Sequence, residues 1–300
     1  MQAPSPVSAY LHSATMVKAG IYLLARLNPV LGGTPQWMFV VSLTGGLTMF
    51  IGAYLAITRT DLKAMLAYTT ISALGTLVLL LGIDTQASIE AAVLFLIIHA
   101  LYKASLFMIA GLIDHKTGTR DISLLGELWK PMPRTFIISV LALLSMAGLP
   151  PMLGFIGKEL IYEAKIQVPD IAGILLILGV SSNILMVWVS TMLGYRTFIE
   201  KDGGMPKPPN EKGYGMLIGP AVLVALSLFF GLFPGSIARF VEPAISAILR
   251  QPAEVYLKLW HGLNEVLLLS ILTVATGFTL FLFRNKVVPL LLKLNSILFR

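Results

Sequence analysis

Residues 145–163 read SMAGLPPMLGFIGKELIYE and lie inside a longer apolar run. The residues that interrupt this run are Gly148, Pro150, Pro151 and Gly154. A proline removes one backbone donor and clashes with the preceding helical turn, so two in a row predict a discontinuous helix. Within a membrane, such a break is tolerated only where protein or water satisfies the freed carbonyls. The stretch therefore predicts a broken membrane helix packed among other helices.

Lys158 follows this break, within the segment LGFIGKELIY. A charged residue inside a membrane helix is costly and is typical of an ion or proton pathway. Alternatively, the helix ends near Lys158 and its charge lies at the membrane surface. The apolar run begins near Phe136, which places Lys158 well inside the span, so we favour the pathway.

The composition is typical of a polytopic helical membrane protein. Of the 300 residues, 56% are hydrophobic and 12% are charged, whereas soluble domains carry about 25% charged residues. The net charge of +7 does not indicate nucleic-acid binding, because the basic residues lie mostly in short segments between apolar runs. The absence of cysteine excludes disulfides, thiolate metal sites and cysteine nucleophiles.

Apolar segments of about 20 residues can cross the membrane, whose hydrocarbon layer is roughly 30 Å thick. The expected spans are about 7–27, 37–57, 62–81, 88–113, 134–165, 171–195, 216–233 and 262–283, and residues 286–300 form a ninth span or an interfacial helix. The expected fold class is therefore an all-α polytopic membrane protein with about 8–9 transmembrane helices, one of them broken near Pro150-Pro151. In the polar loop 114–134, LLGELW predicts a short interfacial helix.

Lysine and arginine are distributed unevenly between alternate loops. The loops near residues 59–63, 116–134, 196–212 and 284–286 are the richer set, although the basic residues in 239–258 break the pattern. Cytoplasmic loops of membrane proteins carry an excess of basic residues. We therefore predict that this set, and with it the N-terminus of the chain, is cytoplasmic.

His99 and Lys103 form a basic pair near the middle of the fourth span, in LIIHALYKASLF. Residues four apart lie on one helix face, about 6 Å apart along the axis. Histidine titrates near neutral pH and a buried lysine can release its proton, so the pair is typical of a proton relay. A hydrogen bond between packed helices is the alternative, and the pairing favours the relay.

Three further basic residues have more than one interpretation. His12, near Ser13 and Thr15 in AYLHSATMVKAG, indicates either a relay element or ordinary interhelical hydrogen bonding. Six residues separate Lys18 from His12, which places them about 9 Å apart along the helix axis and about 120° apart around it. The Lys18 side chain either extends to the membrane surface or pairs with an acidic residue elsewhere. Lys63, at the entrance of the third span, is a surface anchor or part of a polar path.

The sequence contains no metal-ligand cluster, nucleotide-binding loop or hydrolase motif. We therefore predict no catalytic residues, no metal, no cofactor, and a transporter rather than an enzyme.

Four motifs resemble, in this order, signatures of the antiporter-like membrane subunits shared by respiratory complex I and Mrp-type multisubunit cation/proton antiporters. They are PSPVSAYLHSATMVKAGIYLLAR, TDLKAMLAYTTISALG, HALYKASLFMIAG and LSMAGLPPMLGFIGKE, within about residues 3–200. The tail KLWHGLNEVLLLSILT resembles the A-type subunits of the Mrp antiporters.

This resemblance implies two inverted five-helix units, each with one broken helix. Residues 1–30 would be the last helix of the first unit, 31–200 the second unit, and 201–300 additional transmembrane helices. The family's first unit also carries a membrane glutamate and a broken-helix lysine, which this sequence lacks. We therefore interpret the chain as a fragment without the N-terminal helices.

The resemblance also implies a hydrated polar axis through the middle of the membrane, with Lys158 at its exit. The residues assigned to this proton path are His12, Lys63, His99, Lys103 and Lys158, and also Lys18, which matches a lysine of the A-type sequences.

The sequence thus predicts proton translocation within a multisubunit Na⁺ (monovalent cation)/H⁺ antiporter of a bacterial inner membrane. Its partners would be the other membrane subunits, the lipid bilayer, H⁺ and Na⁺, and not nucleic acid. Two alternatives stay open: a proton-pumping membrane subunit of a complex I-like NADH:quinone oxidoreductase, and a truncated remnant that transports nothing.

Overall fold

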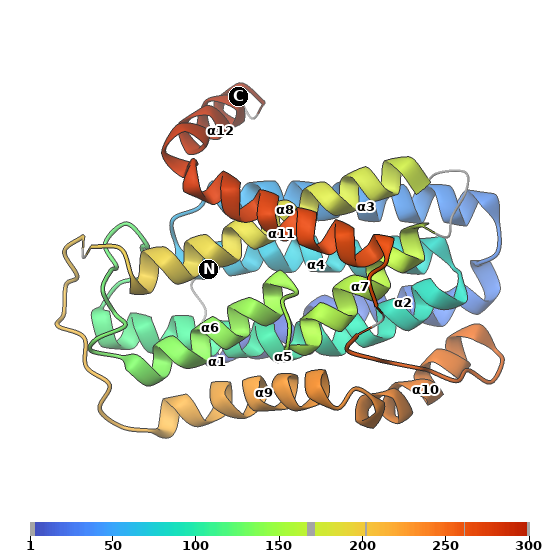
Figure 1. Ribbon diagram of the computed structural model, residues 1–300, viewed down its shortest axis with the longest axis horizontal. Coiled ribbons are helices and arrows are strands. Elements are labelled where there is room, and N and C mark those ends of the chain that lie inside the picture. The colour runs from blue at the N-terminus through green and yellow to red at the C-terminus, as the bar shows by residue number, and fades with distance from the viewer. Residues whose placement is uncertain (1–3, 167–171, 202, 261, 299–300) are drawn as a thin grey trace.

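The computed structural model describes residues 4–166, 172–201, 203–260 and 262–298, which form a bundle of α-helices (Figure 1). The helices are α1 Ser5–Ser13, α2 Met16–Leu31, α3 Pro35–Ile57, α4 Leu62–Ile83, α5 Gln86–Thr117, α6 Pro133–Ala147, α7 Leu153–Ile166, α8 Ala172–Phe198, α9 Gly215–Leu232, α10 Gly235–Leu249, α11 Glu265–Leu282 and α12 Arg284–Leu298. Within these ranges, six helices are long and apolar enough to cross a membrane, namely α3, α4, α5, α8, α9 and α11. Helix α6 is shorter but also apolar. The all-helical bundle with several apolar spans confirms the predicted fold class of an all-α polytopic membrane protein.

Helices α4 and α5 form the buried centre of the bundle. α5 packs against α1, α4, α6, α7 and α9, while α3 covers the other side of α4. Figure 1 shows α9 along one side of the bundle, α11 on the side of α8, and α12 pointing away from the rest. Polar side chains on α4 and α5 are therefore shielded from the lipid by a layer of apolar helices.

Close backbone contact fixes the position of α4 against α3. A Cβ atom on Gly75 of α4 would overlap the backbone of Met49, and one on Gly52 of α3 would overlap the backbone of Ser72. Small residues let membrane helices approach to this distance. This contact sets the position of the α4 carbonyls that face α5.

The α6–α7 break lies where the sequence predicts it. Gly148, with φ of 67°, ends α6, and its amide donates to the Ser145 carbonyl at 3.2 Å. The Leu149 amide donates to the Leu144 carbonyl at 2.9 Å. A left-handed glycine with these two bonds is a common helix ending that satisfies freed carbonyls. The Pro150-Pro151 peptide bond in the loop is cis.

The first span differs from the continuous helix expected over 7–27, because it also is broken. Helix α1 ends at Ser13 and α2 begins at Met16. The Ser13 hydroxyl donates to the Ala9 carbonyl at 2.5 Å, and the Thr15 hydroxyl donates to the Tyr10 carbonyl at 3.2 Å. Hydroxyl groups that bond to the preceding turn compete with the helical hydrogen bonds. The structure thus contains a second discontinuous helix besides the predicted one.

Two other expectations fail locally. LLGELW forms turns rather than an interfacial helix, because its backbone bonds elsewhere: the Glu127 amide donates to the Glu200 carbonyl at 2.8 Å, and the Trp129 amide to the Phe198 carbonyl at 3.3 Å. The segment 239–258, interpreted as a loop, instead contains most of α10.

Candidate functional site

His99 and Lys103 are both completely buried in α5. The Lys103 ammonium donates to the Thr69 hydroxyl at 2.5 Å and to the Leu66 carbonyl at 3.3 Å, both on α4. A buried cation is tolerated only with polar partners. Lys103 is therefore held by oxygen acceptors in the centre of the bundle, and no carboxylate of the described residues pairs with it.

His99 lies one turn away from Lys103 on the same helix. Neither of its ring nitrogens has a hydrogen-bond partner within the described part of the chain. Its ring packs edge-on against Tyr102, with ring centroids 5.5 Å apart. Charge interactions link it to Lys103, Lys18 and His12. A neutral imidazole has one donor and one acceptor nitrogen, and in this buried ring both stay unsatisfied by the described residues.

Lys18 and His12 lie near the His99–Lys103 pair, and they belong to the two helices on either side of the α1–α2 break. The buried Lys18 ammonium donates to the Leu96 carbonyl of α5 at 2.6 Å, three residues before His99. The His12 ring stacks on Phe107 with centroids 5.3 Å apart, and its charge interacts with that of Lys103. The structure thus brings together four of the predicted path residues from α1, α2 and α5.

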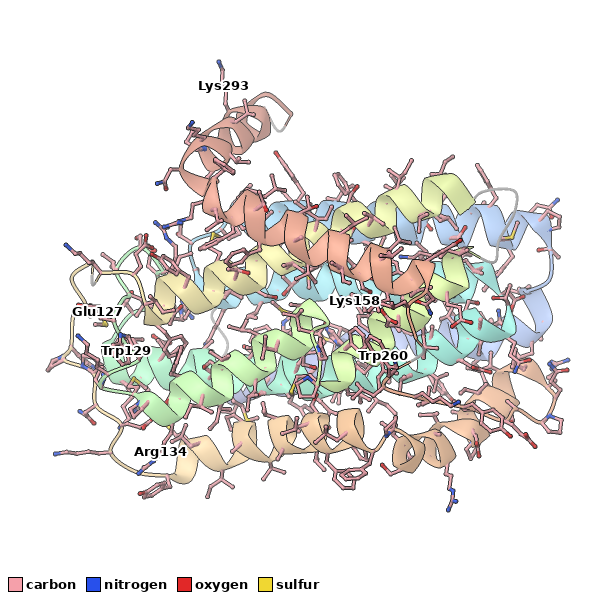
Figure 2. The ribbon with its side chains drawn as sticks, viewed as in Figure 1. Glu127, Trp129, Arg134, Lys158, Trp260 and Lys293 are labelled. Carbon is pink, nitrogen blue, oxygen red and sulfur yellow. The ribbon has the colours of Figure 1, made fainter. Side chains whose placement is uncertain are left out.

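Lys158 lies in the first turns of α7 and is 6% exposed. Figure 2 shows it about midway along the bundle, whereas Glu127 and Arg134 lie at one end. Its ammonium is 5.7 Å from the Phe155 ring centroid. A Cβ atom on Gly148 would lie 2.9 Å from Lys158 Cδ, so the glycine that ends α6 also leaves room for this side chain.

A small cavity lies between Lys158 and the Tyr102 side chain of α5. The cavity volume, measured as the space that the centre of a water molecule can occupy, is about 40 Å³. A single bound water needs roughly 10–15 Å³ of such space, so the cavity is large enough for water. The polar side chains that line it are Ser72, Thr76, Tyr102, Ser145, Lys158, Ser182 and Asn183. Because Tyr102 also packs on His99, water in this cavity would lie between Lys158 and the α5 pair.

Lys63 occupies a different place from the other predicted residues. It is buried in the first turn of α4, where it interacts electrostatically with Arg120, Asp114 and Asp61. Asp61 caps α4 by accepting from the Ala64 amide at 2.8 Å and pairs with Arg120 at 3.1 Å. Lys63 therefore lies at an end of the bundle and not in its middle.

Sequence reasoning missed one buried cation, Lys165. Its position after the apolar part of the span is typical of a loop residue, yet it is 0% exposed at the end of α7. Its spacing of seven residues from Lys158 was the available signal, since residues seven apart lie on nearly the same face of a helix.

A family model described as NADH:quinone oxidoreductase/Mrp antiporter, TM, matches residues 1–185. The chain belongs to this family. The resemblance seen in the four motifs is thereby confirmed, and the protein is a membrane protein of the NADH:quinone oxidoreductase/Mrp antiporter type.

Bacterial relatives extend the similarity almost to the whole chain. The A-type subunit of the Na⁺/H⁺ antiporter from Alkalihalophilus pseudofirmus is 40% identical over 94% of this chain and 39% of its own length. The A/B-type subunit of a probable K⁺/H⁺ antiporter from Rhizobium meliloti is 40% identical over 94% of this chain and 29% of its own.

A solved structure, that of the Mrp complex from Dietzia sp. DQ12-45-1b, is similar with a TM-score of 0.84 and 38% identity. The match covers 96% of this chain and 31% of that chain. This chain therefore spans only about two fifths or less of the length of these proteins.

Proposed function

We propose that this chain translocates protons as part of a multisubunit monovalent cation/proton antiporter. The observation that carries the proposal is the group of buried basic side chains in α2, α5 and α7, with the half-buried His12 of α1 beside them and a cavity large enough for water next to Lys158. Buried ionisable residues in membrane helices are typical of proton pathways. The activity is that of a transporter component and not of an enzyme.

In this mechanism, protons move between His12, Lys18, His99 and Lys103 and cross the cavity to Lys158. His99 can exchange protons through its two unbonded nitrogens, and Thr69 holds Lys103 in place by a hydrogen bond that forms with either of its protonation states. Because the groups interact electrostatically, the gain of a proton at one site favours the loss of a proton at the next. Lys63 would connect the line to the end of the bundle.

Sodium is the proposed cation that is exchanged for protons, because the relatives from Alkalihalophilus pseudofirmus and Bacillus subtilis are both named as A-type subunits of Na⁺/H⁺ antiporters. The name of the Rhizobium meliloti relative makes potassium the competing choice. The proposed partners are other membrane subunits, as in the Mrp complex of Dietzia. We place the chain in a bacterial inner membrane, with its N-terminus and the Lys- and Arg-rich loops in the cytoplasm.

The proposal is tested by transport in vesicles that contain this chain assembled with its partner subunits. Lys158→Ala should lower sodium/proton exchange by roughly a hundredfold, the lower end of what a positioned proton-transfer group contributes. Lys201→Ala is the matched control, because this lysine is exposed in the loop after α8. Undiminished exchange by the Lys158 variant would overturn the assignment.

A proton-pumping subunit of a complex I-like enzyme is the second candidate, because the family model also covers NADH:quinone oxidoreductases. Genes for flavin and iron–sulfur subunits next to this one would favour it, whereas a cluster of small membrane-protein genes would favour the antiporter. A non-transporting remnant would leave exchange unchanged when the chain is deleted from the complex.

A further inference from the structure

Lys165 is a buried cation that the path described above does not use. Its side chain is 0% exposed, and its ammonium has no hydrogen-bond partner among the residues that the structure describes. The ammonium lies directly against α8, where a Cβ atom on Gly179 would overlap it. Lysines that anchor a helix at the membrane surface extend their charge into water. Lys165 does not, so a role as an anchor does not explain it.

The cost of this arrangement argues for a function. Burying an ammonium group without a partner is strongly unfavourable, and a packed apolar residue of similar length would avoid this cost. Ionisable residues that remain under such conditions in membrane helices mark ion or proton routes. Gly179 makes the arrangement possible, because any larger residue at that position of α8 would displace the ammonium.

Lys165 also lies in line with Lys158. Lys158, Tyr162 and Lys165 are spaced four and three residues apart on α7, so they share one face of the helix. Glu159 lies about 100° away around the axis and accepts from the Ser270 hydroxyl of α11 at 2.7 Å. The two lysines therefore lie on a different side of α7 from Glu159, while Tyr162 is close enough to interact with the Glu159 charge.

Helix α8 presents a matching row of small and polar residues. Gly179 contacts Lys165, and Ser182 and Asn183 line the cavity next to Lys158. The Tyr162 hydroxyl lies near Thr273 of α11 and Asn183 of α8. Gly179 and Asn183 are one turn apart on the same face. A seam of hydrogen-bonding groups thus runs between α7 and α8 from the cavity toward the C-terminal end of α7.

We propose that this α7–α8 seam is the exit of the proton path and that Lys165 is its terminal proton acceptor. The inference rests on the proposed function and extends it beyond Lys158. Seven residues of helix separate the two lysines by about 10.5 Å along the axis, which is too far for direct transfer. The proton leaves the Lys158 ammonium, passes by way of cavity water and the Tyr162 hydroxyl, and binds the neutral Lys165 amine, which later releases it to the aqueous phase.

The test compares variants of the assembled complex in proteoliposomes. Lys165→Met keeps most of the length of the side chain but cannot bind a proton, and should lower exchange by about a hundredfold. Because it removes an unpaired buried amine, it should not lower the thermal stability of the complex. A merely structural lysine would show the opposite pattern, with stability lost and transport per assembled complex retained. Lys201→Met is the control for loss of a lysine.

Tyr162→Phe provides an independent test of the same seam, because it removes the hydroxyl with almost no change in volume. It should also lower exchange, and it decides the matter if Lys165→Met does not assemble. If the Lys165→Met complex assembles and exchanges ions at the wild-type rate, the proposed exit is wrong. If it does not assemble, wild-type exchange by Tyr162→Phe leads to the same conclusion. In either case, an inactive Lys158→Ala would still support the proposed function. An active Lys158→Ala would instead overturn the proposed function itself.

Discussion

At the α1–α2 break, side-chain hydroxyls add hydrogen bonds to carbonyls of α1, where the Ala14 amide already donates to the Tyr10 carbonyl at 3.2 Å; at the α6–α7 break, the amides of a glycine turn satisfy the freed carbonyls. Ser13 and Thr15 bond back to α1 in the first case. Gly148 and Leu149 donate their amides to α6 in the second. Each break is followed by a lysine that enters the bundle, Lys18 in α2 and Lys158 in α7. Two different local chemistries therefore serve the same purpose.

The surroundings of the two breaks explain why the chemistry differs. The α1–α2 span lies at the edge of the bundle, where Tyr10, Met16 and Tyr22 are 60% or more exposed. The α6–α7 span is enclosed by α5, α8, α9 and α11. A Cβ atom on Gly154 would overlap the Ser145 carbonyl, and one on Gly231 of α9 would overlap that of Pro151. An enclosed break requires small residues, while a peripheral break has room for hydroxyl side chains.

The largest expected effect tests whether both breaks serve transport. Lys18→Ala should lower exchange in assembled vesicles by about a hundredfold, the lower end for a positioned proton-transfer group, because Lys18 lies beside Leu96 and His99 in the central group. Met16→Ala, at an exposed position of the same helix, is the control. If Lys18→Ala transports normally while Lys158→Ala does not, only the second break belongs to the path.

A smaller effect concerns the fit of the two half-helices. Gly154→Ala should destabilise the complex by about 1–3 kcal/mol because the added methyl group has no space. Gly20→Ala in α2 meets no atom within 4 Å and should be neutral or stabilise by up to about 1 kcal/mol. Thermal unfolding in detergent, followed by circular dichroism, measures both. Equal melting temperatures for the two variants would contradict the difference in packing.

The smallest effect concerns the hydroxyl groups of the first break. Thr15→Val should cost about 1 kcal/mol because it removes the bond from the Thr15 hydroxyl, and the Tyr10 carbonyl at the end of α1 then keeps only the Ala14 amide. Thr44→Val in the unbroken α3 removes a similar bond, from the Thr44 hydroxyl to the Val40 carbonyl at 2.7 Å. The Val40 carbonyl lies inside a continuous helix and not at a helix end. The same unfolding measurement should therefore show the larger loss for Thr15→Val, whose acceptor lies at a helix end, and equal losses would refute a special role for the hydroxyls.

The amino-acid sequence by itself determined the spans, the α6–α7 break and the pairing of His99 with Lys103. These features follow from local rules: apolar length fixes a span, proline removes a helical hydrogen bond, and a spacing of four residues fixes a helix face. They hold whatever the neighbouring helices are, so one sequence is enough to predict them.

Only the tertiary structure decided the first break, the place of Lys63 and the burial of Lys165. Serine and threonine are tolerated in continuous membrane helices as well as at breaks, so SAT carries no clear signal. Whether a lysine near a helix end reaches water depends on the helix packed against it: Asp61 and Asp114 surround Lys63, while Gly179 of α8 encloses Lys165. Burial is a property of neighbours distant in the chain, and a single sequence does not specify which neighbours meet.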